Sequence, residues 1–105
     1  MFGMLTRVRV SGTSMHPTYN DGDVLLVSSW LGVGRGDVVV LEHPQREGLF
    51  IVKRITDARS DAGRRQLWLE GDNPDMTKTD DSWRFGWVDV NRIRGRVLRK
   101  LPSQQ

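Results

Sequence analysis

The sequence of 105 residues contains no cysteine and only two histidines, His16 and His43. The first absence excludes disulfide bonds, thiol nucleophiles and thiolate metal sites. The two histidines lie far apart in the sequence and lack the spacing of paired metal ligands. We therefore expect no bound metal and no other cofactor.

Long hydrophobic runs are also missing, and no stretch approaches the roughly 20 apolar residues of a membrane-spanning helix. Residues 1–5 are too short for a secretory signal and carry no basic leader. Since the first expected strand follows almost at once, we expect a soluble domain of the cytoplasm. Any membrane contact is expected to be peripheral.

Positive charge is only slightly in excess: 16 Lys and Arg residues stand against 13 Asp and Glu residues, for a formal net charge of +3. The basic residues gather late in the chain, at Arg92, Arg94, Arg96, Arg99 and Lys100. We interpret them as a solvated strand face, with an acidic partner or anionic lipid as the open alternative. Because no nucleic-acid-binding motif accompanies them, we expect no nucleic acid partner.

Short β-branched runs bounded by turn residues dominate the chain, and helical periodicity is almost absent. The length allows one domain, residues 1–101, followed by a polar tail, residues 102–105. We predict an all-β fold, a small partly closed barrel or folded antiparallel sheet. Strands are expected at 6–10, 23–27, 37–41, 49–56, 66–70 and 93–101. A mobile polar turn is expected at 57–65, a long loop at 73–83 and one helical turn at 89–92.

Two polar residues stand out against this pattern. Ser14 lies on a glycine-led turn that Pro17 keeps from becoming a helix, and Lys53 lies inside an apolar strand. A buried lysine can activate a serine without histidine, provided that its pKa falls from about 10.4. Desolvation lowers the pKa of a lysine. Ile51 and Ile55 share the strand face of Lys53, so they are the expected apolar wall.

Histidine offers the usual alternative base for a serine. His43 stands beside Pro44 in a polar connection, so we interpret it as solvent-exposed, and His16 receives no catalytic role. The sequence therefore favours a serine–lysine hydrolase.

Several blocks accompany this pair in a fixed order: Ser14-Met15, Pro17-Thr18, Gly22-Asp23, Arg35-Gly36-Asp37, Lys53-Arg54, Gly71-Asp72-Asn73 and Asp81-Ser82. Together they resemble the type I signal peptidase family of serine endopeptidases, from about residue 10 to about residue 98. The resemblance implies a peptidase that removes an N-terminal leader from a precursor protein. Most members carry a membrane anchor before the serine, whereas 13 residues precede Ser14 here, which favours a soluble branch.

The resemblance also implies roles for further residues. Ser14 contributes its backbone N–H to the oxyanion hole as well as its hydroxyl, Thr79 orients the lysine, and Asp81 belongs to the block that supports it. The implied substrate-binding residues are Met15, Pro17, Asp72 and Asn73. An arginine usually follows the Asp-Ser pair; here that position holds Trp83, which leaves Arg84 as the candidate partner of Asp81.

The substrate implied by the family lies as an extended strand near Ser14 and the lysine strand. Three tryptophans are candidate walls of that groove, although core packing is the safer interpretation of each one taken alone: Trp68, Trp83 and Trp87.

Within the family, the short chain and residues 69–75 resemble the nickel-type superoxide dismutase maturation peptidases, whose metal belongs to the substrate. The first alternative is a general signal peptidase, or an inner-membrane peptidase without its anchor. A self-cleaving repressor-type domain is disfavoured because so few residues precede Ser14. A non-enzymatic basic β-domain that binds an anionic surface or nucleic acid is the most distant alternative.

Overall fold

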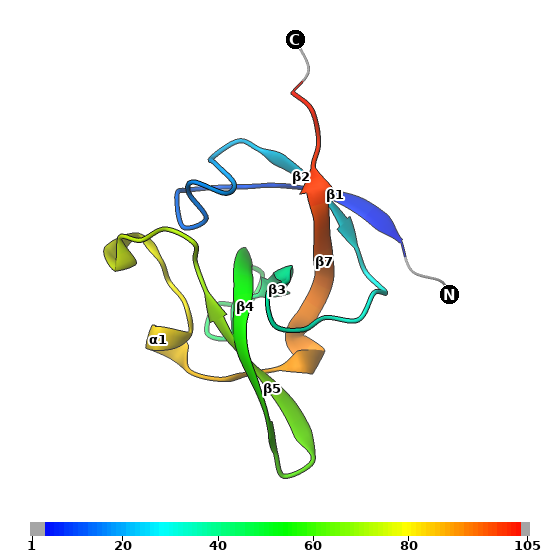
Figure 1. Ribbon diagram of the computed structural model, residues 1–105, viewed down its shortest axis with the longest axis vertical. Coiled ribbons are helices and arrows are strands. Elements are labelled where there is room, and N and C mark those ends of the chain that lie inside the picture. Colours follow the sequence, from blue (N-terminus) through cyan, green and yellow to red (C-terminus); the bar gives the residue numbers. More distant parts are fainter. Residues whose placement is uncertain (1–3, 104–105) are drawn as a thin grey trace.

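The computed structural model describes residues 4–103 and is almost entirely β-structure. Seven antiparallel strands form one sheet in the order β1-β2-β7-β3-β4-β5-β6 (Figure 1). Their bounds are β1 Leu5–Arg9, β2 Val24–Ser28, β3 Val38–Glu42, β4 Phe50–Asp61, β5 Arg64–Glu70, β6 Val88–Asp89 and β7 Ile93–Lys100. The predicted all-β class and folded antiparallel sheet are confirmed.

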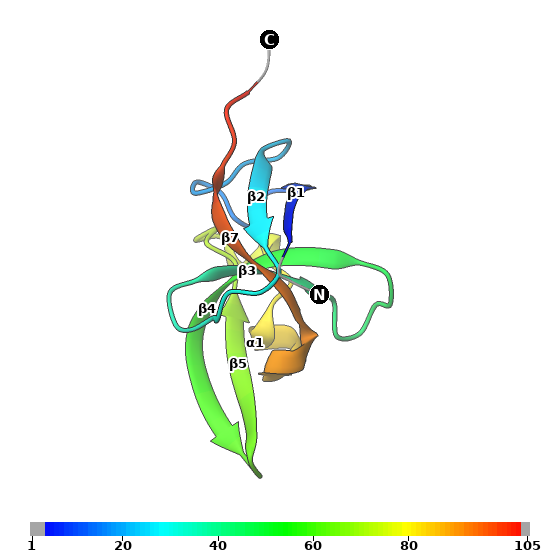
Figure 2. The same ribbon diagram turned by 90° about the vertical axis from the view of Figure 1, so that its right-hand side faces the viewer.

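The sheet is curled but not closed into a barrel, because the edge strands β1 and β6 do not pair with each other. Register shifts interrupt the β2–β7, β3–β7 and β4–β5 ladders. Such irregularities bend a strand and increase its twist, which explains the folded shape in Figure 2.

Three short helices complete the fold: the 3-10 helices η1, Met76–Lys78, and η2, Val90–Arg92, and the single-turn α-helix α1, Ser82–Phe85. The predicted helical turn at 89–92 is confirmed as η2, while α1 was not expected. In the part of the chain that the structure describes, no helix is long and apolar enough to cross a membrane. Of the predicted polar tail, residues 104 and 105 lie outside the described residues.

The predicted mobile turn at 57–65 is wrong. β4 continues to Asp61 and β5 begins at Arg64, so the turn consists only of Ala62 and Gly63. Both have positive φ, 51° and 78°, as a two-residue hairpin turn requires. Polar partners across the ladder stabilise the hairpin, since Arg59 Nε donates to Gln66 Oε1 at 2.8 Å. A polar composition therefore concealed a regular strand pair.

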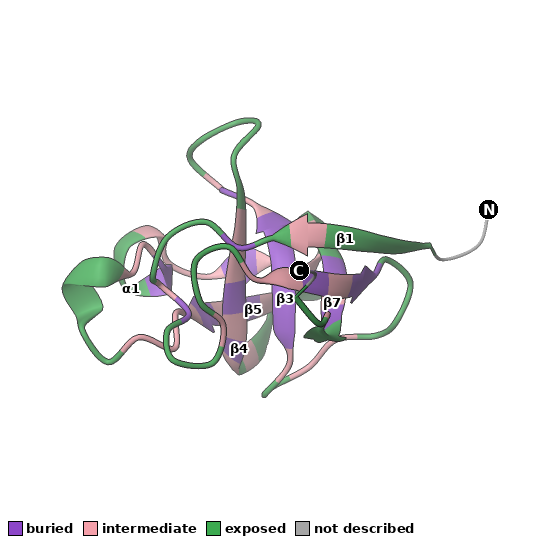
Figure 3. Cartoon of the chain, turned by 90° about the horizontal axis from the view of Figure 1, so that it is seen from above, coloured by how far each residue is buried: buried purple, intermediate pink, exposed green. Residues whose placement is uncertain are grey.

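The core lies on both faces of the central strands, where Figure 3 shows the buried residues concentrated. Alternate residues of β3 point to opposite sides: Val38 and Val40 join one apolar cluster, and Val39 and Leu41 join the other. We call these the Met15 cluster and the Ile55 cluster, after a fully buried member of each.

Candidate active site

The serine loop, residues 10–23 between β1 and β2, is closed at its neck by two backbone hydrogen bonds. Val10 N donates to Asp23 O and Gly22 N donates to Val10 O, each at 2.8 Å. Met15 anchors the loop from inside, because its side chain is fully buried in the Met15 cluster. Ser14, the next residue toward the N-terminus, is half-buried at the surface of this anchored turn.

A second segment, the loop after β5, holds the serine loop in place. Asn73 donates its backbone N–H to Ser14 O at 2.9 Å and its side-chain amide to Thr13 O at 2.8 Å. The two loops lie side by side at the upper left of Figure 1. Asn73 was predicted to bind substrate; the structure instead commits its amide N–H to the backbone of the serine loop.

Gly71 is the point at which the serine, the lysine strand and Thr79 meet. The β4–β5 register pairs Arg54 with Glu70, so Gly71 is the next position, across from Lys53. A Cβ atom on Gly71 would lie 2.5 Å from Ser14 O and 2.6 Å from Thr79 Cγ2. Only a residue without a side chain allows this approach. Gly71 thus lies against both Ser14 O and Thr79, one position beyond the last printed pair of the β4–β5 ladder.

Lys53 is 2% exposed and lies on the sheet face of the Ile55 cluster, with Val39 as its cross-strand partner. Ile51 and Ile55 belong to that cluster, as the alternation of the strand predicted. Burial lowers the pKa of Lys53 below its ordinary value of 10.5, and the carboxylates of Asp81 and Asp80, which raise it, do not cancel this effect. A lysine in this state gives up its proton more readily than one in water.

Within residues 4–103 the Lys53 ammonium has no ion-pair partner, and no hydrogen bond joins it to the Ser14 hydroxyl. Hydrogen bonds of this kind often form only when substrate is bound. The unpaired, desolvated ammonium is the chemically distinctive feature of the site.

Asp81 is buried, and it organises the segment that follows. Its carboxylate caps α1 by accepting from Trp83 N at 3.1 Å and also accepts from Gly71 N at 3.2 Å. Arg84 was expected to pair with Asp81. Its guanidinium instead lies 3.4 Å from the carboxylate of Asp80. The reason is helical spacing, because residues four apart face the same side of a turn.

Thr79 lies against Gly71, and the hydrogen bond of its hydroxyl does not go to Lys53. Its hydroxyl donates to Met76 O at 3.2 Å, in the last turn of η1, and its methyl group faces Gly71. A contact between this hydroxyl and Lys53 stays a prediction that requires the hydroxyl to rotate.

Two predicted substrate-binding residues have other roles. The side chain of Met15 is fully buried in the Met15 cluster. Asp72 is engaged by Arg54, which donates to both of its oxygens at 2.9 and 2.8 Å, and by the Thr18 hydroxyl at 2.6 Å. These contacts tie β4 to the serine loop, and substrate binding by Asp72 stays a prediction. Pro17, by contrast, is exposed beside Ser14 and follows a cis peptide bond.

Replacing Asp72 with asparagine is expected to lower the free energy of unfolding by about 2 kcal/mol at pH 7, because the ionic part of this network disappears. Burial by itself raises the pKa of Asp72. The hydrogen bonds from Arg54 and Thr18 and the charge of Arg54 lower it by a larger amount, so the net pKa lies below its ordinary value. The carboxylate therefore stabilises the fold above its ordinary pKa of about 4, and this contribution is lost in acid.

Urea unfolding at pH 7 and pH 3 measures this effect, with the exposed Asp61→Asn as matched control. The difference between wild type and Asp72→Asn should shrink at pH 3, whereas Asp61→Asn should match wild type at both values. An equal deficit at both pH values would contradict an ionic role for Asp72.

His43 is buried, so the interpretation of an exposed histidine is wrong. Its Nδ1 accepts from Gln45 N at 3.0 Å and its Nε2 lies 2.8 Å from Asp80 Oδ2, so the ring donates to that carboxylate. Phe85 packs edge-on against it with ring centroids 5.2 Å apart. The polar residues beside it, Glu42 and Gln45, gave no sign that a carboxylate 37 positions away would contact it.

Ser82 was also missed as a structural residue: it is buried, and its Oγ accepts from Leu69 N at 2.8 Å. The Asp-Ser pair therefore satisfies two backbone donors of the β5 edge, one through Asp81 and one through Ser82.

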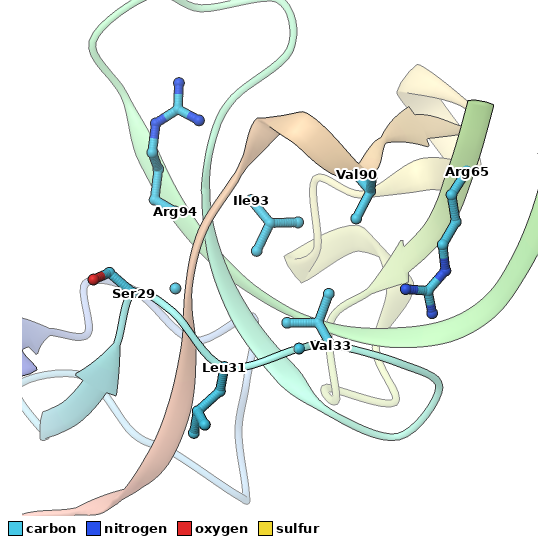
Figure 4. A pocket seen from close by; sticks show the side chains of 9 residues that line it. Ser29, Leu31, Val33, Arg65, Val90, Ile93 and Arg94 are labelled. Atoms are coloured by element: carbon cyan, nitrogen blue, oxygen red, sulfur yellow. The ribbon is translucent and has the colours of Figure 1, made fainter. Parts of the chain in front are cut away.

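A separate hollow lies away from these residues, between the loop after β2 and the start of β7. Figure 4 shows Val33, Val90 and Ile93 turned toward one another there, with Arg65 at the rim. None of the predicted site residues lines it, so it does not contribute to the candidate active site.

Comparison with known proteins agrees with this geometry. The peptidase S24-like family matches residues 3–87, and the fold together with this match defines a peptidase of the signal-peptidase type. The chain belongs to the peptidase S24-like family.

Among curated relatives, mitochondrial inner membrane protease subunit 1 of Xenopus tropicalis is 31% identical, over 90% of this chain and 68% of its own. The human protein of the same name is 30% identical with the same coverage. Subunit 1a of the mitochondrial ATP-independent inner membrane protease of Arabidopsis thaliana is 29% identical, over 93% of this chain and 71% of its own.

Proposed function

We propose that this domain is a serine endopeptidase that removes an N-terminal leader from a precursor protein, with Ser14 as nucleophile and Lys53 as general base. The observation that carries the proposal is the buried Lys53, which has no ion-pair partner among residues 4–103 and lies on the strand that passes beside Gly71 and the Ser14 carbonyl. A lysine with a lowered pKa is one of the few groups able to deprotonate a serine without histidine.

The chemistry follows from these positions. Ser14 Oγ attacks the scissile carbonyl carbon while its proton passes to Lys53 Nζ, and the Ser14 N–H donates to the oxyanion. The C–N bond then breaks, and the leaving amine takes the proton from Lys53. Water, deprotonated by the same lysine, hydrolyses the acyl-enzyme and restores the serine. Asp81 and Thr79 support the segment that faces the lysine, and no metal or cofactor takes part.

An unpaired stretch of sheet edge lies next to Lys53 and suits an extended substrate. β4 pairs with β3 from Phe50 to Arg54, but its pairing with β5 begins only at Arg54. The opposite edge of residues 50–52, directly before Lys53, therefore has no strand neighbour in the sheet. A peptide that adds to this edge would bring its backbone toward Ser14, with Pro17 exposed beside it.

As the precursor we propose a nickel-type superoxide dismutase with its leader, on the resemblance of residues 69–75, with the cleavage taking place in the cytoplasm or at a membrane surface. The names of the relatives favour a second candidate, a precursor at an inner membrane.

Intact-mass spectrometry of each precursor after incubation distinguishes the two. We expect a single cut that exposes the mature N-terminus of the superoxide dismutase, and no cut by Ser14→Ala. A cut only in a membrane precursor in detergent would move the assignment to the second candidate. Cutting by Ser14→Ala would contradict the nucleophile.

A further inference from the structure

Behind the loop after β5, two tryptophans share one carboxylate. The rings of Trp68 and Trp83 lie nearly perpendicular, at 84°, with centroids 5.3 Å apart. Both indole N–H groups donate to the same oxygen, Glu70 Oε2, at 3.0 and 3.1 Å. We call these three residues the Trp–Glu cradle. Two hydrogen bonds to one oxygen hold the carboxylate in a fixed orientation.

The cradle has binding capacity that the chain itself does not use. Among residues 4–103 no cation lies within ion-pair distance of Glu70, and no hydrogen bond reaches its other oxygen, Oε1. Trp83 is 64% exposed, which is unusual for so large an apolar side chain. An exposed indole beside a free carboxylate oxygen suits a cation, which gains from both the ring face and the charge.

The neighbouring basic residues are already engaged. Arg54, across the ladder from Glu70, donates to Asp72 and to Gly36 O, and Arg84 pairs with Asp80. The same aromatic group already holds one cation of the chain: the guanidinium of Arg59 lies 4.4 Å from the centre of the Trp87 ring, which packs on Trp68. This contact demonstrates that the group accommodates a guanidinium over an indole face.

The cradle lies next to the candidate active site. Glu70 immediately precedes Gly71, whose backbone contacts the Ser14 carbonyl, and Trp83 follows the Asp81-Ser82 pair. A side chain on a peptide bound at Ser14 can therefore reach it.

We propose that the Trp–Glu cradle is a subsite for a lysine or arginine side chain of the precursor, and thus selects precursors with a basic residue near the scissile bond. This inference rests on the proposed function. Its selectivity comes from the carboxylate, since an apolar side chain would gain from the indole alone.

The test measures binding in Ser14→Ala protein, so that no cleavage intervenes. Tryptophan fluorescence is followed during titration with an alanine–serine host peptide that carries one lysine, or norleucine in its place. We expect the lysine peptide to bind about tenfold more tightly, with the difference reduced by salt. In Glu70→Gln, whose side-chain oxygen still accepts from the indoles, the two peptides should bind equally.

Matched controls are Glu47→Gln and Trp30→Phe, both at exposed positions outside the cradle, which should keep the tenfold preference. Trp83→Phe should weaken it. Equal binding of the two peptides to the Ser14→Ala protein, tighter binding of norleucine, or no binding at millimolar peptide would each overturn the subsite. A charge-dependent preference in a protein that cleaves no precursor would instead keep the subsite and reject the peptidase function.

Discussion

Lys53→Met and Ser14→Ala are each expected to lower kcat/KM for precursor cleavage by about 1,000-fold or more, since each removes one half of the proton transfer. Methionine has nearly the length of lysine and no charge, so it fits the apolar surroundings of Lys53. The measurement is initial-rate cleavage of the precursor at pH 8. Lys78→Met is the matched control, because Lys78 is exposed on η1 and should retain the wild-type rate.

The stability of Lys53→Met separates a catalytic lysine from a structural one. In the wild type the folded state binds a proton at Lys53 less readily than the unfolded chain, because burial lowers its pKa. The free energy of unfolding should therefore rise with pH between that lowered pKa and about 10.5, where the unfolded chain also loses the proton. We expect Lys53→Met to be at least as stable as wild type at pH 7 and to lack this rise.

The pH dependence of kcat/KM follows from the same shift. The value of kcat/KM should increase tenfold per pH unit on the acid side. It should level off at a pH below 10.5, where Lys53 of the substrate-free enzyme is neutral.

A Lys53→Met enzyme that retained substantial activity would remove lysine from the role of base. A loss of activity accompanied by unfolding would point to a structural role instead.

Gly71→Ala is expected to have the second largest effect. The added Cβ would lie 2.5 Å from Ser14 O and 2.6 Å from Thr79 Cγ2, so the serine loop must shift away from the lysine strand. The loop cannot yield freely, because Asn73 and the buried Met15 anchor it on either side of this contact. We expect a loss of about 2 kcal/mol of stability and at least a 100-fold loss of kcat/KM.

The control is Gly32→Ala, since nothing lies within 4 Å of a Cβ at Gly32 and its φ is not in the left-handed region. Thermal unfolding and cleavage rates of the two variants give the comparison. Should Gly71→Ala cleave at the wild-type rate, the close approach of Ser14 to the lysine strand would not matter for the reaction.

The residues predicted to bind substrate show that hydrogen-bond partners cannot be predicted from the sequence alone. The resemblance to the signal peptidase family implied that Asp72 and Asn73 bind substrate. In the fold their side chains face Arg54, Thr18 and Thr13, and they hold the serine loop. Those partners come from segments up to 60 positions away in the sequence, so no local pattern predicts these contacts.

The sequence alone determined the all-β class and most strand positions, because these depend on local preference and on alternation along a strand. It also predicted that a turn serine pairs with a strand lysine. Tertiary structure decided the rest. The burial that lowers the pKa of Lys53, the contact at Gly71, the buried His43–Asp80 pair and the Trp–Glu cradle each join segments distant in sequence. Desolvation and hydrogen-bond partners depend on which segments pack together, and only the folded sheet specifies that.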